Sequence, residues 1–543
     1  MKKISIIVMA LVAAAGCTSG QMESGTYGYD LQFFKDQGVE TVEIASPDGS
    51  SRVLMVPAWQ GRVMTSTTGG ENGRSYGWIN HKYIESGEVS PQFNSYGGEE
   101  RFWIGPEGGP NSFYFAPGTE QVYANWVVPK VIDTEAFQVD GRTSDSVSYS
   151  RRASLVNASG NRFDLGIRRV VRLESAGDVL GIEVPEGVKA LAYSTENTLV
   201  NEGDQAWTRE TGMPSVWLLG TLNPTPTTTV FIPCNVPTDG KVVKDDYFGK
   251  VPSDRLVVRD GFVFFRIDGR YRAKIGLPQG SARDLCGSYD SANHVLNILK
   301  YTVPEGPCDY VNGQWGHQDN PFGGDVINSY NDGPTETGTI MGPFYEIETS
   351  SPGAALAPGE SLTHKQYTLH FEGDEESLSA IAESVFGIGL KSVSSVFSRE
   401  VYDDSADPVE QIRTAVREAS DSGRFVICQV GGNWCSWCLK FAEFIEQDSD
   451  IREILHKNFV YAHINVRRVN PATGEKEQCT EAMNMLGNPE RFGFPVLVVL
   501  DEEGKVIHIQ DTALLEEGEG YDRLKVLFFL DRWTPEAVKG AKE

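Results

Sequence analysis

The chain has 543 residues, with 48 Lys and Arg against 75 Asp and Glu, which gives a formal net charge of −27. A surface this acidic repels nucleic acid and anionic lipid headgroups, so both are poor partners and no nucleic-acid ligand is expected. The length is sufficient for two or three hydrophobic cores.

The N-terminus predicts a lipoprotein signal peptide. Lys2 and Lys3 form a charged start, and Ile4 to Ala15 is apolar but too short to span a bilayer. The small residues before Cys17 resemble a bacterial lipobox. This resemblance implies removal of residues 1–16, lipidation of Cys17, and a tether over 17–24. We expect a lipid anchor in the cell envelope, in the outer membrane facing the periplasm; a secretory signal with a chance Cys is the alternative.

Residues 25–373 predict a large all-β sandwich. The region is rich in Gly, Thr, Val, Tyr and Trp, and short alternating runs are separated by turn residues. We expect strands at Arg52–Val56, Val147–Arg151, Thr228–Ile232, Leu256–Val258 and Val295–Tyr301. So many short strands over this length favour a sandwich over a small barrel.

Four stretches of the β region carry a family resemblance. They are Pro57–Val63, Tyr96–Gly109, Asp325–Pro334 and Phe344–Thr349. Together they resemble an uncharacterised family of bacterial lipoproteins whose sandwich is similar to the galactose mutarotase-like supersandwich. The resemblance implies that fold but no established reaction.

The residue types in these stretches suit a sugar ligand. Aromatic faces stack on sugar rings, and charged side chains satisfy hydroxyl groups. Glu346 and Glu348 are two apart on a predicted strand, so both face one side, opposite Tyr345 and Ile347. The predicted glycan-binding residues are Arg62, Glu100, Arg101, Trp103, Glu107, His317, Glu346 and Glu348. Internal salt bridges are the alternative for the charged members.

Catalysis on a sugar has weaker support than binding. A mutarotase needs a Glu base and a His acid. Glu346 or Glu348 suits the first role, but His317 lies outside the His motif of the epimerase family. We therefore expect ligand binding.

Residues 374–404 predict a helical connector. Glu375–Val385 has the period of an amphipathic helix, and Val393–Asp407 is mostly polar. The domain boundary is expected between 393 and 405. A further helix, Pro408–Ala419, leads into the C-terminal region, 405–543.

The C-terminal region contains a Cys-x-x-Cys motif. Cys435 and Cys438 follow a predicted strand, Phe425–Val430, and precede a predicted helix, Leu439–Ile445. A thiol at a helix N-terminus is stabilised as thiolate, so we expect Cys435 to attack and Cys438 to resolve. A zinc site with Cys479 and either His456 or His463 matches no ordinary spacing, so no metal is expected. A structural or vestigial Cys pair stays open.

A second motif completes the redox prediction. Phe492-Gly493-Phe494-Pro495 precedes an apolar strand, Val496–Leu500, then a turn and Lys505–Ile509. With the Cys pair, this stretch resembles the thioredoxin-like superfamily. The resemblance implies an α/β fold, a cis Phe494–Pro495 bond against the cysteines, and a catalytic role for Pro495. It also implies substrate contacts from Trp434, Trp437 and Phe494.

Gln429 departs from that superfamily, which usually has a buried Asp six residues before the first Cys. Because an amide cannot titrate, we expect slower proton transfer to and from Cys438. The other cysteines after Cys17 are Cys234, Cys286, Cys308, Cys428 and Cys479. A pair between Cys286 and Cys308 is one option, whereas Cys428 reads as a small core residue.

These features lead to one functional hypothesis. The chain is a lipid-anchored protein whose thioredoxin-like domain exchanges disulfides with protein partners and whose sandwich binds carbohydrate. No cofactor is expected, and the membrane is contacted only through the lipid. Two alternatives stay open: a carbohydrate-binding or carbohydrate-processing lipoprotein with a non-catalytic thioredoxin-like module, and a structural envelope protein with neither activity.

Overall fold

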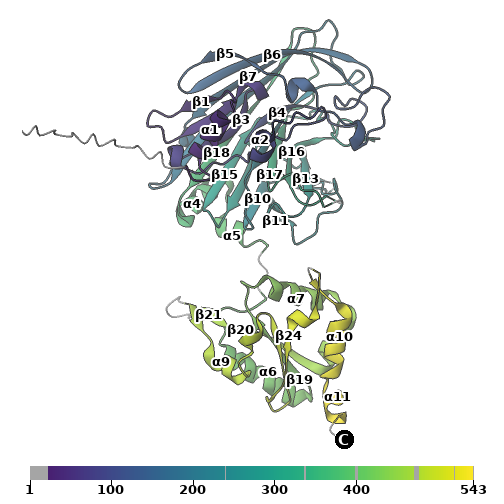
Figure 1. Cartoon of the computed structure of the whole chain (residues 1–543). Helices are drawn as coiled ribbons and strands as arrows, with labels where there is room; N and C mark the ends of the chain where they lie inside the picture. The colour runs from purple at the N-terminus through teal and green to yellow at the C-terminus, as the bar shows by residue number, and fades with distance from the viewer. Residues whose placement is uncertain are drawn as a thin grey trace, which may run out of the picture. The chain divides into compact units, whose positions relative to one another are not determined.

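The computed structural model describes residues 22–238, 240–335, 338–397, 401–469, 476–518 and 520–541. The chain divides into two compact units, Met1–Phe397 and Ser398–Glu543, both drawn in Figure 1. This division falls inside the stretch 393–405, where the boundary is expected. The signal peptide and Cys17 lie outside the described residues.

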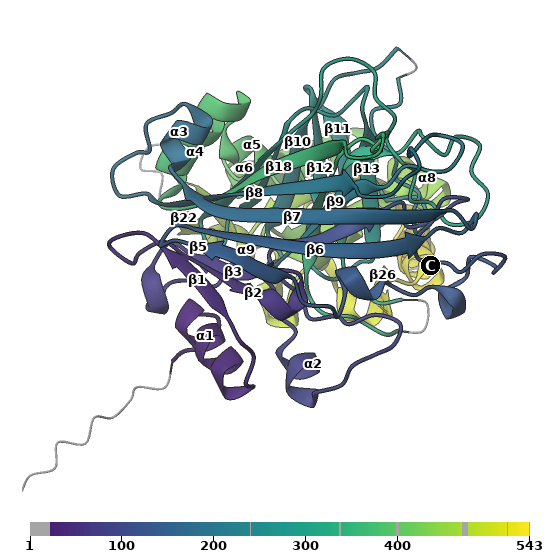
Figure 2. The same cartoon turned by 90° about the horizontal axis from the view of Figure 1, so that it is seen from above.

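The first unit is built on two large antiparallel sheets. Figure 2 shows β6, β7 and β8 of the larger sheet side by side. The larger sheet has the order β11 (Leu256–Arg259), β12 (Phe262–Arg266), β10 (Thr228–Pro233), β14 (Leu285–Asp290), β15 (Val295–Tyr301), β18 (Ser361–Glu372), β8 (Lys189–Asn201), β7 (Arg162–Glu174), β6 (Ser146–Val156) and β5 (Gln138–Arg142). The smaller sheet has the order β13 (Ala273–Pro278), β16 (Asp325–Asn331), β17 (Tyr345–Ser350), β9 (Ser215–Leu222) and β4 (Arg101–Gly105).

The two sheets pack face to face because side chains alternate along their strands, so that each sheet has one apolar face. Tyr345 and Ile347 on β17 share a buried apolar cluster with Val230 and Leu299 of the larger sheet. Glu346 and Glu348 alternate with these two residues along β17, so they point to the opposite face of the smaller sheet, where they make their ion pairs. The expectation that both glutamates face one side is therefore confirmed.

Smaller elements complete the first unit. A three-stranded sheet is formed by β1 (Val42–Ala45), β2 (Arg52–Val56) and β3 (Arg62–Thr67), and the short helices are α1 (Tyr27–Asp36), α2 (His81–Ser86) and α3 (Ala176–Leu180).

The predicted amphipathic helix is present as α4 (Glu375–Phe386) and is followed by α5 (Leu390–Ser394). Asp374 caps α4 through the backbone N–H of Ser377, and Gly387 ends it with a φ of 78°. Its buried face joins Phe231 and Leu369 of the larger sheet in one apolar cluster. The two helices therefore belong to the core of the first unit.

The second unit is an α/β domain around a four-stranded sheet. Its order is β20 (Phe459–Asn465), β19 (Phe425–Gly431), β23 (Val496–Leu500) and β24 (Val506–Asp511). β19 runs parallel to β20 and antiparallel to β23. The helices are α6 (Pro408–Ser422), α7 (Ser436–Gln447), α8 (Ser449–Asn458), α9 (Thr480–Met485), α10 (Arg523–Arg532) and α11 (Pro535–Gly540). Two further antiparallel pairs join β21 (Arg467–Val469) to β22 (Lys476–Gln478) and β25 (Glu516–Glu517) to β26 (Gly520–Tyr521).

Candidate functional site

The Cys pair lies at the junction of β19 and α7, as the sequence predicts. Cys435 and Cys438 are joined by a disulfide, with their Cα atoms 5.2 Å apart. Cys435 is the N-cap of α7, and its Sγ accepts the backbone N–H of Cys438 at 3.1 Å. The same helix N-terminus would stabilise a Cys435 thiolate after reduction.

The expected cis Phe494–Pro495 bond is present next to this disulfide. Pro495 directly precedes β23, which pairs with β19, and its carbonyl accepts a hydrogen bond from Thr512. Phe494 and Trp437 pack against the two cysteines. The chain thus brings Phe494, the residue before the cis proline, against Cys435 and Cys438.

The two tryptophans of the motif take different positions. Trp434 is 58% exposed, and its ring meets the edge of Phe494 with centroids 5.5 Å apart. Trp437 is half-buried against Tyr521 on the other side. Of the predicted substrate contacts, Trp434 and Phe494 therefore form one aromatic surface, whereas Trp437 packs into the domain.

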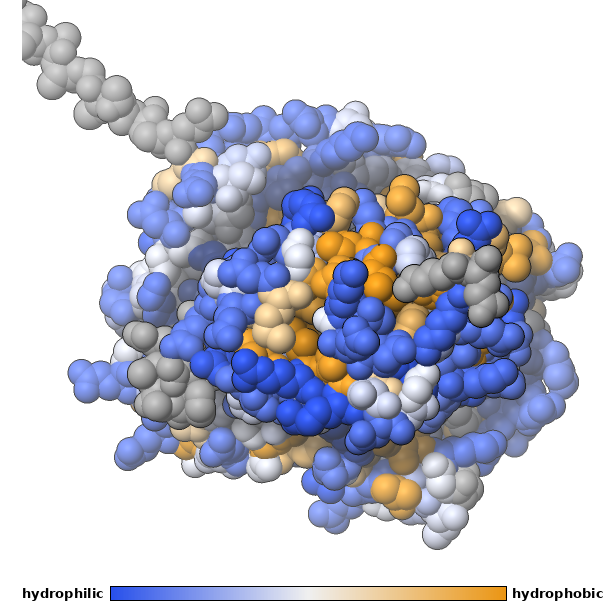
Figure 3. Space-filling model, turned by 90° about the horizontal axis from the view of Figure 1, so that it is seen from below, coloured by the Kyte–Doolittle hydropathy of each residue, from blue (hydrophilic) through white to orange (hydrophobic). Residues whose placement is uncertain are grey.

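Other large apolar side chains of the second unit are also exposed. They are Met485, Phe492, Leu514, Leu524 and Phe528. Figure 3 shows one face of the molecule, on which hydrophobic residues gather inside a border of hydrophilic ones.

A residue missed in the sequence, Tyr402, is buried beside the disulfide. It forms an apolar cluster with Cys435 and Cys438. Gln429 Nε2 donates to Tyr402 Oη at 2.7 Å and to the Cys438 carbonyl at 2.9 Å, and its Oε1 accepts from Tyr461 at 2.7 Å. Position 429, where the superfamily usually has a buried Asp, is thus occupied by a hydrogen-bonded amide. No local signal marks Tyr402, because it lies in the polar connector.

In the first unit, several predicted glycan-binding residues meet on the outer face of the smaller sheet. Arg101 Nη2 pairs with Glu346 at 2.7 Å, and its guanidinium lies 4.6 Å from the Trp103 ring centre. Glu348 accepts from two residues that the sequence did not single out, Lys274 at 2.8 Å and Trp217 at 2.9 Å. We call this group the carboxylate cluster: Arg101, Trp103, Trp217, Lys274, Glu346 and Glu348, with Glu107 at its margin.

The carboxylate cluster is nearly closed to solvent. The side chains of Arg101, Glu346 and Glu348 are at most 9% exposed, and that of Lys274 is 14% exposed. Burial raises the pKa of Glu107 to about 7, although the positive charge of Lys274 opposes the shift. Burial also raises the pKa of Glu346, against the attraction of Arg101. Carboxyl groups held in this range can both give and take a proton near neutral pH.

Three buried polar atoms of the cluster have no hydrogen-bond partner among the described residues. They are Arg101 Nε, Trp103 Nε1 and Glu348 Oε1. Buried polar groups in proteins are nearly always hydrogen-bonded, so two donors and one acceptor are available to a polar ligand here.

Three predicted glycan contacts lie elsewhere. Arg62 is fully buried and donates to the Gly97 carbonyl at 2.9 Å. Glu100 is also fully buried and pairs with Arg169 at 2.8 Å. His317 is 90% exposed and faces only Asp319 among the ion pairs of the described residues. The alternation of β3 and the position of Glu100 just before β4 direct Arg62 and Glu100 into the interior. His317 is instead exposed at the surface, so none of the three residues belongs to the candidate site.

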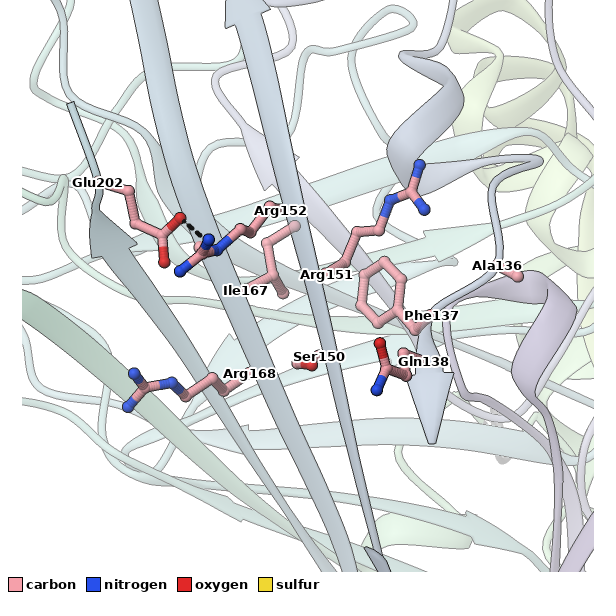
Figure 4. A pocket seen from close by; sticks show the side chains of 10 residues that line it. Ala136, Phe137, Gln138, Ser150, Arg151, Arg152, Ile167, Arg168 and Glu202 are labelled. Carbon is pink, nitrogen blue, oxygen red and sulfur yellow. Dashed lines mark ion pairs between the residues drawn. The ribbon is translucent and has the colours of Figure 1, made fainter. Parts of the chain in front are cut away.

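A surface cavity of about 650 Å³ lies away from the cluster, on the larger sheet. It is lined by Ala136–Gln138, Ser150–Arg152, Gly166–Arg168 and Glu202, and Figure 4 shows the 2.9 Å ion pair of Arg152 with Glu202. None of the predicted glycan-binding residues lines it.

The remaining cysteines are free in the described part of the chain. Cys286 and Cys308 do not form the disulfide that the sequence left open, and Cys428 is buried in β19 as expected. In the same part, no cluster of three or more His, Cys, Asp or Glu side chains could hold a metal, and no helix is long and apolar enough to cross a membrane.

Comparison with solved structures finds similar folds for both units. A galactose mutarotase-like protein from Lactobacillus casei is 11% identical and covers 61% of this chain and 99% of its own, with a TM-score of 0.35. A galactose mutarotase related enzyme from Lactobacillus acidophilus is 9% identical, with coverages of 62% and 98% and a TM-score of 0.36. A disulphide isomerase from Xylella fastidiosa is 20% identical, with coverages of 25% and 96% and a TM-score of 0.21. At these identities the likeness concerns the fold alone.

Family comparison assigns both units. No curated protein matches the chain. Residues 412–513 match the thioredoxin-like domain family, in agreement with the resemblance seen in the sequence. Residues 25–397 match a family of unknown function, DUF6786, and because this match spans more than half of the chain, the chain belongs to that family.

Proposed function

We propose that the second unit exchanges disulfides with protein partners through Cys435 and Cys438. One observation carries this proposal: the two cysteines form a disulfide whose first member caps a helix, and Phe494, which precedes the cis proline, packs against the pair. This arrangement provides a thiolate-stabilising helix end and a second thiol within reach.

The reaction balances without a cofactor. In the reduced protein, the Cys435 thiolate attacks a partner disulfide, forms a mixed disulfide and releases one partner thiolate. Cys438 then attacks Cys435 Sγ, which re-forms the disulfide seen here and releases the second partner thiol. The partner gains two electrons and two protons, and the reverse sequence oxidises a partner dithiol.

Reduction of a model protein disulfide tests this proposal. Cys435→Ala should abolish activity, and Cys438→Ala should accumulate mixed disulfides. Cys428→Ala is the matched control, because Cys428 is a buried free thiol in the same unit. Full activity of Cys435→Ala would remove Cys435 from the reaction, and a parent chain that reduces no protein disulfide would favour the alternative in which the unit is a non-catalytic interaction module.

A second candidate function is carbohydrate binding at the carboxylate cluster. It is favoured by the unpartnered Arg101 Nε, Trp103 Nε1 and Glu348 Oε1, which match the donors and acceptors of sugar hydroxyl groups. A glycan array tests it, and any glycan that binds is then titrated in solution with tryptophan fluorescence as the signal. Glu346→Gln should weaken any binding found, whereas Arg168→Gln, in the separate surface cavity, should not. An array without a binder would remove this function.

The location in the cell is a third part of the proposal. The lipobox-like sequence before Cys17 supports a lipid anchor in the envelope. Cys17→Ala should release the protein from membranes on fractionation. A variant that pellets with membranes as strongly as the parent would contradict the anchor.

A further inference from the structure

We propose that Tyr402 is a positioning residue of the redox site, and that its hydroxyl donates a hydrogen bond to the Cys438 sulfur when the disulfide is reduced. This inference rests on the proposed exchange activity. It follows from the anchoring of Tyr402, its position beside Cys438, and the direction of the hydrogen bonds around it.

The segment that carries Tyr402 is attached to the redox loop. Asn433 Oδ1 accepts the backbone N–H groups of Val401 at 2.9 Å and Tyr402 at 3.0 Å, and Asn433 Nδ2 donates to the Tyr402 carbonyl at 2.7 Å. Asn465 Nδ2 donates to the next carbonyl, that of Asp403, at 3.0 Å. Asn433 is two residues before Cys435, so the loop of the disulfide itself fixes the position of Tyr402.

The Tyr402 hydroxyl and the Cys438 sulfur both lie next to Gly431, which has no side chain. A Cβ atom built on Gly431 would clash with Cys438 Sγ and lie 3.0 Å from Tyr402 Oη. Only a glycine leaves room for both groups at this point. Tyr402 is 2% exposed, so water does not compete freely for its hydroxyl.

The direction of the hydrogen bonds leaves the hydroxyl proton of Tyr402 unused. The Cys438 carbonyl can only accept, so the Gln429 atom that faces it must be the NH₂ group. The same NH₂ group donates to Tyr402 Oη. Tyr402 therefore accepts from Gln429 and keeps its own proton for another acceptor, and a reduced Cys438 is an acceptor within the same cluster.

This donor would act when the disulfide opens. A thiolate reductant attacks Cys435 Sγ, the bond between the two sulfurs breaks, and its electron pair remains on Cys438 as a thiolate. Burial raises the pKa of Tyr402 further above its ordinary value of 10, so the hydroxyl stays protonated and donates to that thiolate without giving up its proton. Cys438 later takes its proton from solvent.

The test uses Tyr402→Phe in the full chain, which keeps the ring and removes the hydroxyl. A hydrogen bond to a charged group contributes enough that we expect reduction by dithiothreitol to slow about tenfold and the pKa of Cys438 to rise by about one unit. The thiol pKa values are read from the ultraviolet absorbance of the thiolates. Tyr521→Phe is the matched control, because the Tyr521 hydroxyl donates to the Trp437 carbonyl and not to a sulfur.

Other titratable groups face Tyr402 and are held constant in this comparison. The His463 ring packs 5.2 Å from the Tyr402 ring, Tyr461 lies beyond Gln429, and Tyr521 acts on Tyr402 electrostatically. All are present in both parent and variant, so the difference between the two pH profiles reports Tyr402.

The outcomes separate this inference from the proposed function. A parent chain without a reversible disulfide would overturn the proposed function and this inference with it. A reversible parent with a Tyr402→Phe variant of unchanged rate and unchanged thiol titration would overturn the inference alone. If Tyr402→Phe does not fold, Asn433→Ala carries the same test: release of the segment should raise the pKa of Cys438, and an unchanged pKa would overturn the inference.

Discussion

The redox site and the carboxylate cluster differ in how far apart their members lie in the chain. Cys435 and Cys438 are separated by three positions. Glu348 lies 74 positions from Lys274 and 131 from Trp217, and Arg101 lies 245 from Glu346. The first site is assembled by one turn of helix and one loop, whereas the second depends on the register of strands β4, β9, β13 and β17. A local site should therefore tolerate substitution better than a site that holds a sheet together.

The largest expected effect is a loss of stability when the carboxylate cluster of the first unit is disrupted. Glu348→Ala leaves the Lys274 ammonium buried without a partner, so we expect a loss of about 3–5 kcal/mol in the free energy of unfolding. The measurement is urea unfolding followed by tryptophan fluorescence. Glu196→Ala is the matched control, because its pair with Lys365 is also 2.8 Å long but lies on the surface. That control should cost less than about 1 kcal/mol. Equal losses would mean that the cluster does not support the sheet.

A smaller effect is expected when the free energy of unfolding is measured as a function of pH, because Glu107 is buried. Burial raises the pKa of Glu107 from 4.5 to about 7, so between these values the folded state binds more protons than the unfolded state. Its contribution to stability is complete below pH 4.5 and is lost as the pH rises through 7, with a size of about 3 kcal/mol. Unfolding measured across this window should show the fall in the parent and a flatter profile in Glu107→Gln. Parallel profiles would contradict the raised pKa.

The smallest expected effect concerns the aromatic surface beside the disulfide. Trp434→Ala removes an exposed ring that packs on Phe494, so kcat/KM for a protein disulfide should fall about tenfold while glutathione disulfide reacts as before. Trp437→Phe is the comparison, because Trp437 packs against Tyr521 and should affect stability instead. Equal losses towards both substrates would assign Trp434 to the chemistry and not to partner binding.

The contrast between the sites also explains what the sequence could predict. Periodicity placed the strand Val295–Tyr301 at its observed bounds and put Glu346 and Glu348 on one face, because alternation is a property of the strand alone. The Cys pair and the cis Phe494–Pro495 bond followed from two short motifs.

The partners of these residues could not be predicted in the same way. Lys274 and Trp217 join Glu348 through the pairing of separate strands, and no short-range pattern in the sequence encodes that register. Glu100 lies in the same stretch as Arg101, and Arg62 lies in another of the four family-resembling stretches, yet both Arg62 and Glu100 point into the interior. Tyr402 is held beside the disulfide because Asn433 bonds its backbone and Asn465 bonds the carbonyl of the next residue, Asp403.

Whether Cys435 and Cys438 exchange disulfides is tested by a redox titration of the pair in glutathione buffers, followed by alkylation of free thiols. We expect a reversible two-electron transition that involves these two cysteines and leaves Cys428 unchanged, and loss of that transition in Cys435→Ala. A pair that stays fully oxidised or fully reduced across the range, or a transition that persists in Cys435→Ala, would contradict it.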